Sequence, residues 1–274
     1  MTHKTYAKLG EYSIIDMLAV AAAREVKDEE VVFAGTGLPM LAIMLAQRLN
    51  APNCKLIYEA GTIDSRSDSL PSSVGDPRCV TKAAVASGLF DVFNQLQRGK
   101  IDLAYLGGAE IDKYGNVNTT VVGDYTNPTM RFPGSGGNPD INSLAKRTVF
   151  IMVQEKRRFK ERVDYITSPG WMVKKWPEGT LVPRRQVYGK KFLGGPSAVI
   201  TNMAVFRFNE ETGMMYVDTI HPGVSQEQLQ ENTGFELDFS RCKGETEPPT
   251  YEELRILYEA VDPEGIFLTP QRKK

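Results

Sequence analysis

Short apolar runs that alternate with helical segments constrain the fold of this chain more than any other feature. The runs cover residues 31–34, 55–58, 102–106 and 149–153. Their length and β-branched content predict strands buried in a sheet. Apolar residues recur at helical spacing over residues 12–26, 39–49 and 82–97. Because strands that alternate with helices build parallel sheets, the sequence predicts an α/β fold with an open, largely parallel sheet flanked by helices.

The second half of the chain has a different pattern. Residues 197–220 predict a β-hairpin with a charged turn at Gly213, and residues 225–231 and 250–260 predict short helices. Residues 62–80 are polar and predict a long loop. The length of 274 residues fits one domain, with flexible ends at about 1–11 and 266–274.

Composition excludes several classes of function. The formal net charge of −1 shows no excess of positive charge for binding nucleic acid. No apolar run approaches the roughly 20 residues that span a bilayer. The N-terminus lacks the apolar core of a signal peptide, so we expect a cytoplasmic protein without membrane contact. The three cysteines form no ligand spacing, and His221 is read as a structural residue at a turn. We therefore expect no metal site.

Glu59 is the candidate nucleophile. Ligands of open parallel sheets bind beyond the carboxyl ends of the strands, and Gly35, Glu59 and Gly107 all follow predicted strands. A glutamate is ionised at neutral pH and can attack an activated carbonyl without a general base. The structural alternative is a solvated or helix-capping glutamate at a strand end.

Glycine-rich turns surround this position. Gly35-Thr36-Gly37 is no dinucleotide fingerprint, because Met40 stands where the third glycine belongs. Its unshielded amides could instead stabilise an oxyanion, as could those of Gly107-Gly108. Gly134-Ser135-Gly136 is either a plain loop or an anion-binding nest.

Positive charge concentrates in the middle of the chain. The basic segments cover residues 155–162, 174–176 and 183–191. They form either a solvated or subunit-contacting surface, or an anchor for a polyanion such as the phosphates of coenzyme A.

Nine segments resemble, in the same order, segments of the B subunit of family I coenzyme A transferases. Glutaconate CoA-transferase is a member of that family. The nine segments are GTGLP (35–39), YEAG (58–61), SVGDPR (73–78), LGGAEIDKYGNVN (106–118), GDYTNP (123–128), RFPGSGG (131–137), EKRRF (155–159), VDYITSPGW (163–171) and ENTGFELD (231–238). The resemblance covers about residues 12–265 and is weakest over 171–195.

The resemblance implies a transferase that moves coenzyme A between an acyl-CoA and a free carboxylic or dicarboxylic acid. Glu59 would carry a glutamyl-CoA thioester, with Gly35 to Gly37 serving one oxyanion hole and Gly107-Gly108 the other. Ala60, Gly61 and residues 134–136 would contact substrate. The family needs no permanent cofactor, since acyl-CoA is the substrate. It implies an A subunit as partner, in a heterodimer or a dimer of heterodimers.

Two other hypotheses remain open at this stage. Relatives with the same fold resemble hydrolases or decarboxylases of CoA-linked dicarboxylates, although a decarboxylase carries cysteine at the nucleophile position, where this chain has Glu59. A non-catalytic subunit that binds an anionic metabolite is the third hypothesis.

Overall fold

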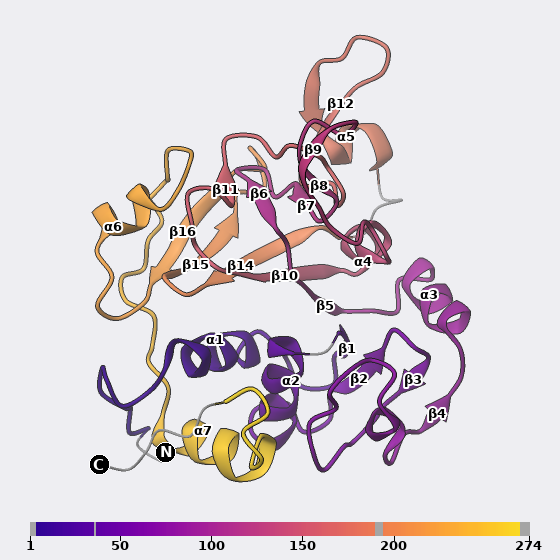
Figure 1. Ribbon diagram of the computed structural model, residues 1–274, viewed down its shortest axis with the longest axis vertical. Helices are drawn as coiled ribbons and strands as arrows, with labels where there is room; N and C mark the ends of the chain where they lie inside the picture. Colours follow the sequence, from indigo (N-terminus) through magenta and orange to yellow (C-terminus); the bar gives the residue numbers. More distant parts are fainter. Residues whose placement is uncertain (1–3, 36, 190–193, 269–274) are drawn as a thin grey trace. The chain divides into compact units, whose positions relative to one another are not determined.

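The computed structural model describes residues 4–35, 37–189 and 194–268. They form two compact units, Met1–Tyr105 with Glu247–Lys274, and Leu106–Thr246. Each unit combines strands and helices, as Figure 1 shows, so the predicted α/β class is confirmed. That all 274 residues act as one domain stays a prediction.

The strands of the first unit have a parallel centre. They are β1 (Val31–Ala34), β2 (Lys55–Tyr58), β3 (Thr62–Ile63), β4 (Val85–Ala86) and β5 (Leu103–Leu106). The order is β5-β1-β2-β3-β4, and β1 pairs in parallel with both β2 and β5. Strands β3 and β4 continue the sheet in antiparallel pairing. The carboxyl ends of β1, β2 and β5 consequently share one edge.

The helices of the first unit begin at well-defined caps. They are α1 (Ile14–Ala23), α2 (Leu38–Arg48), α3 (Leu89–Gln97) and α7 (Tyr251–Ile256), with a 3-10 turn at Pro77–Val80 and a π-helical turn at Leu257–Val261. Ser13 caps α1 and Thr250 caps α7, each in a reciprocal capping box. Helix α2 is buried from Met40 to Ala46 and packs against α1 and α7 (Figure 1).

The second unit contains four groups of strands. The largest has the order β16-β15-β14-β10, in which β10 and β14 are parallel and the other pairs antiparallel. These strands are β10 (Arg147–Met152), β14 (Pro196–Thr201), β15 (Ala204–Phe208) and β16 (Met215–Ile220). A second sheet contains β6 (Glu110–Asp112), β7 (Val117–Asn118) and β11 (Phe159–Lys160).

Two separate hairpins and three short helices complete this unit. The hairpins are β8 (Val121–Gly123) with β9 (Pro128–Arg131), and β12 (Met172–Lys174) with β13 (Leu181–Pro183). The helices are α4 (Asn138–Leu144), α5 (Arg184–Tyr188) and α6 (Gln226–Glu231).

The structure corrects the expected loop and helix between residues 62 and 97. The segment 62–80 contains β3 and the 3-10 turn, so it is not a plain loop. The helix predicted from residue 82 begins only at Leu89, because Gly88 is its N-cap and Val85–Ala86 pair as β4. This correction places an edge strand directly beside the candidate nucleophile's turn.

The predicted hairpin over 197–220 is three strands rather than two. An extra turn separates β14 from β15, where Thr201 Oγ1 accepts hydrogen bonds from the amides of Met203 and Ala204 at 3.1 and 3.0 Å. The threonine hydroxyl thus closes a turn that contains neither glycine nor proline.

The predicted flexible ends fall partly outside the described residues, which exclude 1–3 and 269–274. Within the described part, the Ala7 amide donates to the Pro249 carbonyl over 2.8 Å, and Tyr6 forms a β-bridge with Thr250. Near the other end, the Leu268 amide donates to Asp262 Oδ2 over 2.7 Å. The described parts of both ends are therefore held by hydrogen bonds.

Candidate active site

Glu59 and Ala60 form the turn between β2 and β3. The Gly61 amide closes this turn by donating to the Tyr58 carbonyl over 3.0 Å. The Gly61 carbonyl in turn accepts hydrogen bonds from the amide and the hydroxyl of Ser87, at 3.0 and 2.8 Å. Gly61 has a φ of +121°, and a Cβ on it would lie 2.3 Å from the Ser87 carbonyl oxygen. Only glycine fits here, and the turn is held firmly against the end of β4.

The Glu59 side chain itself has no partner in the part of the chain that the structure describes. It is half-buried, while Ala60 is exposed. Among the residues that the structure describes, none forms a hydrogen bond or ion pair with its carboxylate. A rigid turn thus presents an uncommitted carboxylate at the carboxyl end of a buried strand, which is the arrangement that a nucleophile requires.

The register of the sheet brings the first glycine turn to the same edge. Ala34 of β1 pairs with Tyr58 of β2, so Gly35 and Glu59 follow neighbouring strand ends. A Cβ on Gly35 or Gly37 would meet nothing within 4 Å, and Gly37 has a φ of +89°. The backbone at Gly35 and at Gly37 is therefore open to an approaching group. Thr36, the third predicted oxyanion residue here, lies outside the described residues.

The polar loop over residues 72–79 lies near Tyr58, the last residue of β2. Tyr58 is fully buried, and burial raises the pKa of its phenol, with smaller contributions from Cys79 and Asp76. The Asp76 carboxylate accepts hydrogen bonds from the amides of Ser72 and Arg78, both at 2.9 Å. The Arg78 guanidinium, 2.6 Å away, lowers the pKa of Asp76 well below its usual range. These contacts fix the loop that packs near Tyr58, the residue before Glu59.

The remaining predicted site residues belong to the second unit. Gly107 is exposed, whereas a Cβ on Gly108 would lie 2.5 Å from Val117 Cγ1. Gly134 and Gly136 have φ values of +105° and +50°, and a Cβ on either would meet nothing within 4 Å. Ser135 between them is exposed. Close packing thus explains Gly108, while Gly107 and residues 134–136 present open backbone.

Two residues near Glu59 were missed by sequence reasoning. Ser87 holds the turn through Gly61, but residues 82–97 were read as a helix, in which Ser87 could not serve as this strand-end donor. Asp76 lies in a segment that was read as loop, and an Asp followed by Pro and Arg was its only local signal.

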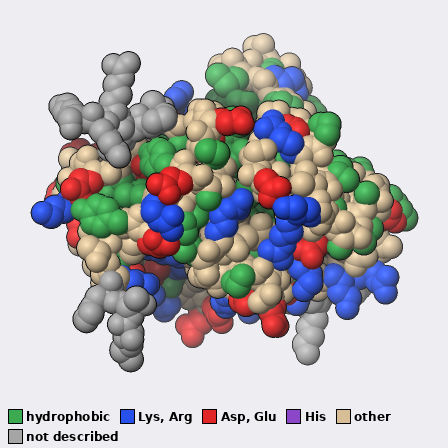
Figure 2. All heavy atoms as spheres, turned by 90° about the horizontal axis from the view of Figure 1, so that it is seen from below, with side chains coloured by type: hydrophobic (Ala, Val, Ile, Leu, Met, Phe, Trp, Pro, Cys, Tyr) green, Lys and Arg blue, Asp and Glu red, His purple; other side chains and the backbone are tan. Residues whose placement is uncertain are grey.

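The basic segments are largely engaged in local ion pairs. Arg157 and Arg158 both donate to Glu155, and Lys160 pairs with Asp164 at 2.8 Å. Arg184 is buried, and burial lowers its pKa to about 10, so it stays charged at neutral pH. Figure 2 views the structure from below Figure 1, and on that face basic and acidic side chains are interspersed as well. These contacts favour a structural role for much of the predicted anchor, and Lys190 and Lys191 lie outside the described residues.

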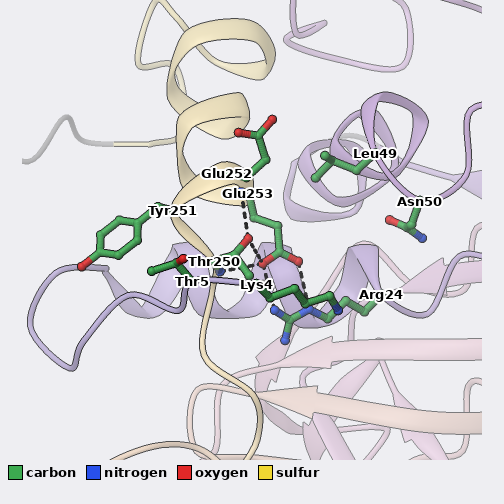
Figure 3. A pocket seen from close by; sticks show the side chains of 9 residues that line it. All are labelled: Lys4, Thr5, Arg24, Leu49, Asn50, Thr250, Tyr251, Glu252 and Glu253. Atoms are coloured by element: carbon green, nitrogen blue, oxygen red, sulfur yellow. Dashed lines mark hydrogen bonds and ion pairs between the residues drawn. The ribbon is translucent and has the colours of Figure 1, made fainter. Parts of the chain in front are cut away.

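A cavity of about 820 Å³ opens elsewhere in the first unit. Arg24, Thr250 and Glu253 line it, as Figure 3 shows. Arg24 pairs with Glu253 at 2.8 Å, and Glu253 also accepts the amide and the hydroxyl of Thr250 at 2.7 and 2.8 Å. The lining also includes Leu49, past the end of α2 and therefore toward the amino ends of the strands. The Arg24–Glu253 ion pair in its lining joins α7 to the residue that follows α1. This cavity therefore lies apart from the strand-end turn that carries Glu59.

The buried histidine has a structural environment. His221 lies 2.9 Å from Thr246 Oγ1 and 2.8 Å from the Thr201 carbonyl, and burial lowers its pKa to about 4. Over the described ranges, no three histidine, cysteine or acidic side chains gather in a way that could hold a metal ion. Within the same ranges, no helix combines the length and apolarity needed to cross a bilayer.

Comparison with known proteins places most of the chain in one family. The family model described as "Coenzyme A transferase" matches residues 15–232. The B subunit of glutaconate CoA-transferase from Acidaminococcus fermentans is 38% identical over 263 residues, covering 94% of this chain and 95% of that protein. The B subunit of 3-oxoadipate CoA-transferase from Pseudomonas knackmussii is 38% identical, covering 91% and 93%.

A solved structure extends the likeness to the fold. The crystal structure of glutaconate coenzyme A-transferase from Acidaminococcus fermentans matches with a TM-score of 0.85 and 36% identity, covering 95% of this chain and 98% of that one. The model match, the relatives and the shared fold all indicate one assignment. The chain belongs to the coenzyme A transferase family.

Proposed function

We propose that this chain is the B subunit of a CoA transferase and that Glu59 forms the glutamyl-CoA thioester. The observation that carries the proposal is the Glu59 carboxylate, which has no partner among the described residues and lies on a turn held by hydrogen bonds between Gly61 and Ser87. The names of the two relatives favour a dicarboxylate or 3-oxo dicarboxylate as one of the acids.

The proposed reaction needs no redox step. A Glu59 oxygen attacks the thioester carbonyl, the C–S bond breaks, and the CoA thiolate leaves a mixed anhydride behind. The thiolate then attacks the glutamyl carbonyl and expels the donor carboxylate, which leaves CoA on Glu59 as a thioester. The acceptor carboxylate reverses both steps and departs as the new acyl-CoA. Each step exchanges one anion, a carboxylate or a thiolate, for another and transfers no proton, so no general base is needed.

Two oxyanions form in this cycle, and backbone amides are the proposed donors. The turn Gly35 to Gly37 would serve one, because it follows the strand beside Glu59 and its backbone is open at Gly35 and Gly37. Gly107 and Gly108 would serve the other. Loss of one such donor costs about 2.7–4 kcal/mol in comparable sites. Ala60, Gly61 and residues 134–136 are the proposed substrate contacts, and acyl-CoA is the substrate rather than a resident cofactor.

An exposed apolar segment supports the proposed A subunit. Residues 84–91, AVASGLFD, are all exposed and carry no charge before Asp91. Phe90 is 80% exposed, and Val85 belongs to the edge strand β4. Uncovered apolar edges of this kind mark protein interfaces. Because Ser87 of this segment holds the Glu59 turn, an A subunit that covers it would also exclude water from the nucleophile.

Substitution of the nucleophile tests the proposal. In the reconstituted A/B complex, Glu59→Gln should lower kcat by at least about a thousandfold, because the amide cannot form the thioester. Glu231→Gln, an exposed glutamate at the end of α6, is the matched control and should retain full activity. Unchanged turnover in Glu59→Gln would refute the assignment. Equally fast acyl-CoA loss without an acceptor acid would indicate a hydrolase.

A further inference from the structure

The loop of residues 134–137 has little packing at its glycines. Gly134 and Gly136 have φ values of +105° and +50°, and a Cβ on either would meet nothing within 4 Å. Ser135 and Gly136 are exposed. Glycine has more conformational freedom to lose on folding than any other residue. A loop of this composition keeps one conformation only if hydrogen bonds from elsewhere in the chain restrain it.

The Thr119 hydroxyl supplies such a restraint. It donates to the Gly134 carbonyl over 3.0 Å, at the start of the loop. It also accepts a longer hydrogen bond, of 3.4 Å, from the side-chain amide of Asn138, the first residue of α4. One hydroxyl therefore connects the two ends of the loop, although Thr119 precedes Gly134 by 15 residues and Asn138 by 19.

Thr119 is itself held in place by Thr167. The Thr119 amide donates to Thr167 Oγ1 over 2.9 Å, and the hydroxyls of Thr120 and Thr167 lie 2.7 Å apart. Thr167 is buried, and its amide donates to the Val117 carbonyl of β7 over 2.9 Å. A chain of hydrogen bonds thus runs from a buried threonine, through Thr119, to the exposed loop.

The bond to the Gly134 carbonyl also fixes the direction of the next amide. The peptide bond between Gly134 and Ser135 is trans. A trans peptide unit is planar, and its N–H points opposite to its C=O. Because the carbonyl points to Thr119, the Ser135 amide points away from Thr119. That amide forms no hydrogen bond with any residue that the structure describes, so it can donate to an oxygen atom of a ligand.

We propose that Thr119 is a positioning residue, which directs the Ser135 amide toward an oxygen atom of bound acyl-CoA. This inference rests on the proposed function, in which residues 134–136 contact the substrate. Thr119 does not touch the reacting atoms, and it acts through the Gly134 carbonyl. Its loss should therefore weaken substrate binding rather than slow the bond-forming steps at Glu59.

Hydrogen exchange of the reconstituted A/B complex tests the effect on the loop. Thr119→Val keeps the size of the side chain and removes the hydroxyl, so a peptide covering residues 133–138 should exchange at least about threefold faster. Thr119→Ser keeps the hydroxyl and should exchange at nearly the unmodified rate. Thr129→Val is the matched control, because the Thr129 hydroxyl also donates to a backbone carbonyl, that of Val122 over 3.1 Å, but outside this loop.

Steady-state kinetics of the same variants separate a positioning role from a structural one. Thr119→Val should raise the KM for acyl-CoA at least about fivefold and leave kcat within about twofold, as expected when an interaction with the substrate is lost equally in the ground state and the transition state. Thr119→Ser should restore the KM, and Thr129→Val should change neither parameter.

Three results would overturn the proposal. The first is unchanged exchange of residues 133–138 in Thr119→Val. The second is faster exchange of the loop with the same KM as in Thr129→Val. The third is faster exchange that extends through β10, because Thr119 would then stabilise the whole unit. Coenzyme A bound to Glu59 is measured separately at saturating acyl-CoA. Its absence from the unmodified complex would refute the proposed nucleophile and leave the comparison of KM values standing.

Discussion

The Glu59 turn and the hairpin of β6 and β7 both place acids beside glycines in segments that match the transferase family, yet the two regions treat their carboxylates in opposite ways. Asp112 is buried, and its Oδ1 accepts the amides of Tyr114 and Asn116, each at 3.0 Å, while Oδ2 accepts the Asn116 side chain at 2.9 Å. Glu59 is half-buried and has no such partner among the described residues.

The difference separates a carboxylate that builds the fold from one available for chemistry. At Asp112, burial raises the pKa and the hydrogen bonds from Asn116 oppose that shift, so the group is committed to its hairpin. At Glu59 the backbone is fixed while the side chain stays uncommitted. Substitutions should therefore impair stability at the first site and activity at the second.

The largest effect on stability is expected at Asp112. Asp112→Ala would leave the amides of Tyr114 and Asn116 and the Asn116 side chain without their acceptor, at a cost of about 4 kcal/mol in the free energy of unfolding. Glu59→Gln should change that free energy by less than about 0.5 kcal/mol. Urea denaturation of both variants checks the comparison. Similar losses at the two sites would show that Glu59 is also a structural residue.

His221 is buried, and both of its ring nitrogens have hydrogen-bond partners. It should make the free energy of unfolding depend on pH. Its pKa is lowered to about 4 in the fold by burial, against about 6.5 in an unfolded chain. Between these values the unfolded state binds the extra proton, so stability is full above pH 6.5 and decreases as pH falls toward 4. The loss should reach roughly 3 kcal/mol. Thermal unfolding from pH 7.5 to 4 measures it, and His221→Asn should remove most of the slope. An unchanged slope would contradict the assignment to His221.

The Glu59 turn is held by the hydrogen bonds between Gly61 and Ser87, whereas the neighbouring glycine turn is open at Gly35 and Gly37. Substitution of one glycine in each turn compares the two. Gly61→Ala should destabilise the protein by about 2 kcal/mol or more, because its Cβ would lie 2.3 Å from a backbone oxygen. Gly37→Ala meets no neighbour and should cost about 1 kcal/mol, from its positive φ alone. Calorimetry of the two variants decides the order. Equal melting temperatures would mean that Ser87 does not restrain the turn.

The smallest effect is expected at the apolar segment beside the turn. Phe90→Asp should weaken binding to the A subunit at least tenfold, or about 1.4 kcal/mol. Ile14→Asp is the matched control, since Ile14 is also an exposed apolar residue in the first turn of a helix. An added acid is tolerated at both helix starts. Titration calorimetry with the A subunit should separate the variants, and equal affinities would exclude residues 84–91 from the interface.

Sequence reasoning predicted the parts of the fold in which a strong periodic pattern coincides with burial. Strands β1 and β2 were predicted at their observed bounds. Short apolar runs that end at glycine-containing turns favour a buried strand over a helix or a loop. The two-residue strands β3 and β4 were missed, since two residues carry no alternation. The turn at Thr201 was missed because a hydroxyl, rather than glycine or proline, forms it.

For the candidate site, too, sequence reasoning named some residues and missed others. A strand-end glutamate beside glycines is visible in the sequence, so Glu59 and Gly35 could be named. The contact between Gly61 and Ser87 could not, because it joins residues 26 positions apart and its acceptor is the backbone carbonyl of Gly61, which carries no sequence signal. The pairing of the Asp76 carboxylate with Arg78 likewise depends on a turn geometry that the residue types permit but do not require.

The most direct test of the account is the mass of the peptide that contains Glu59 after acyl-CoA is added to the reconstituted A/B complex without an acceptor acid. We expect that peptide to gain coenzyme A, and the gain to disappear in Glu59→Gln. A coenzyme A adduct on any other residue, or full turnover with no adduct on this peptide, would contradict the role of Glu59.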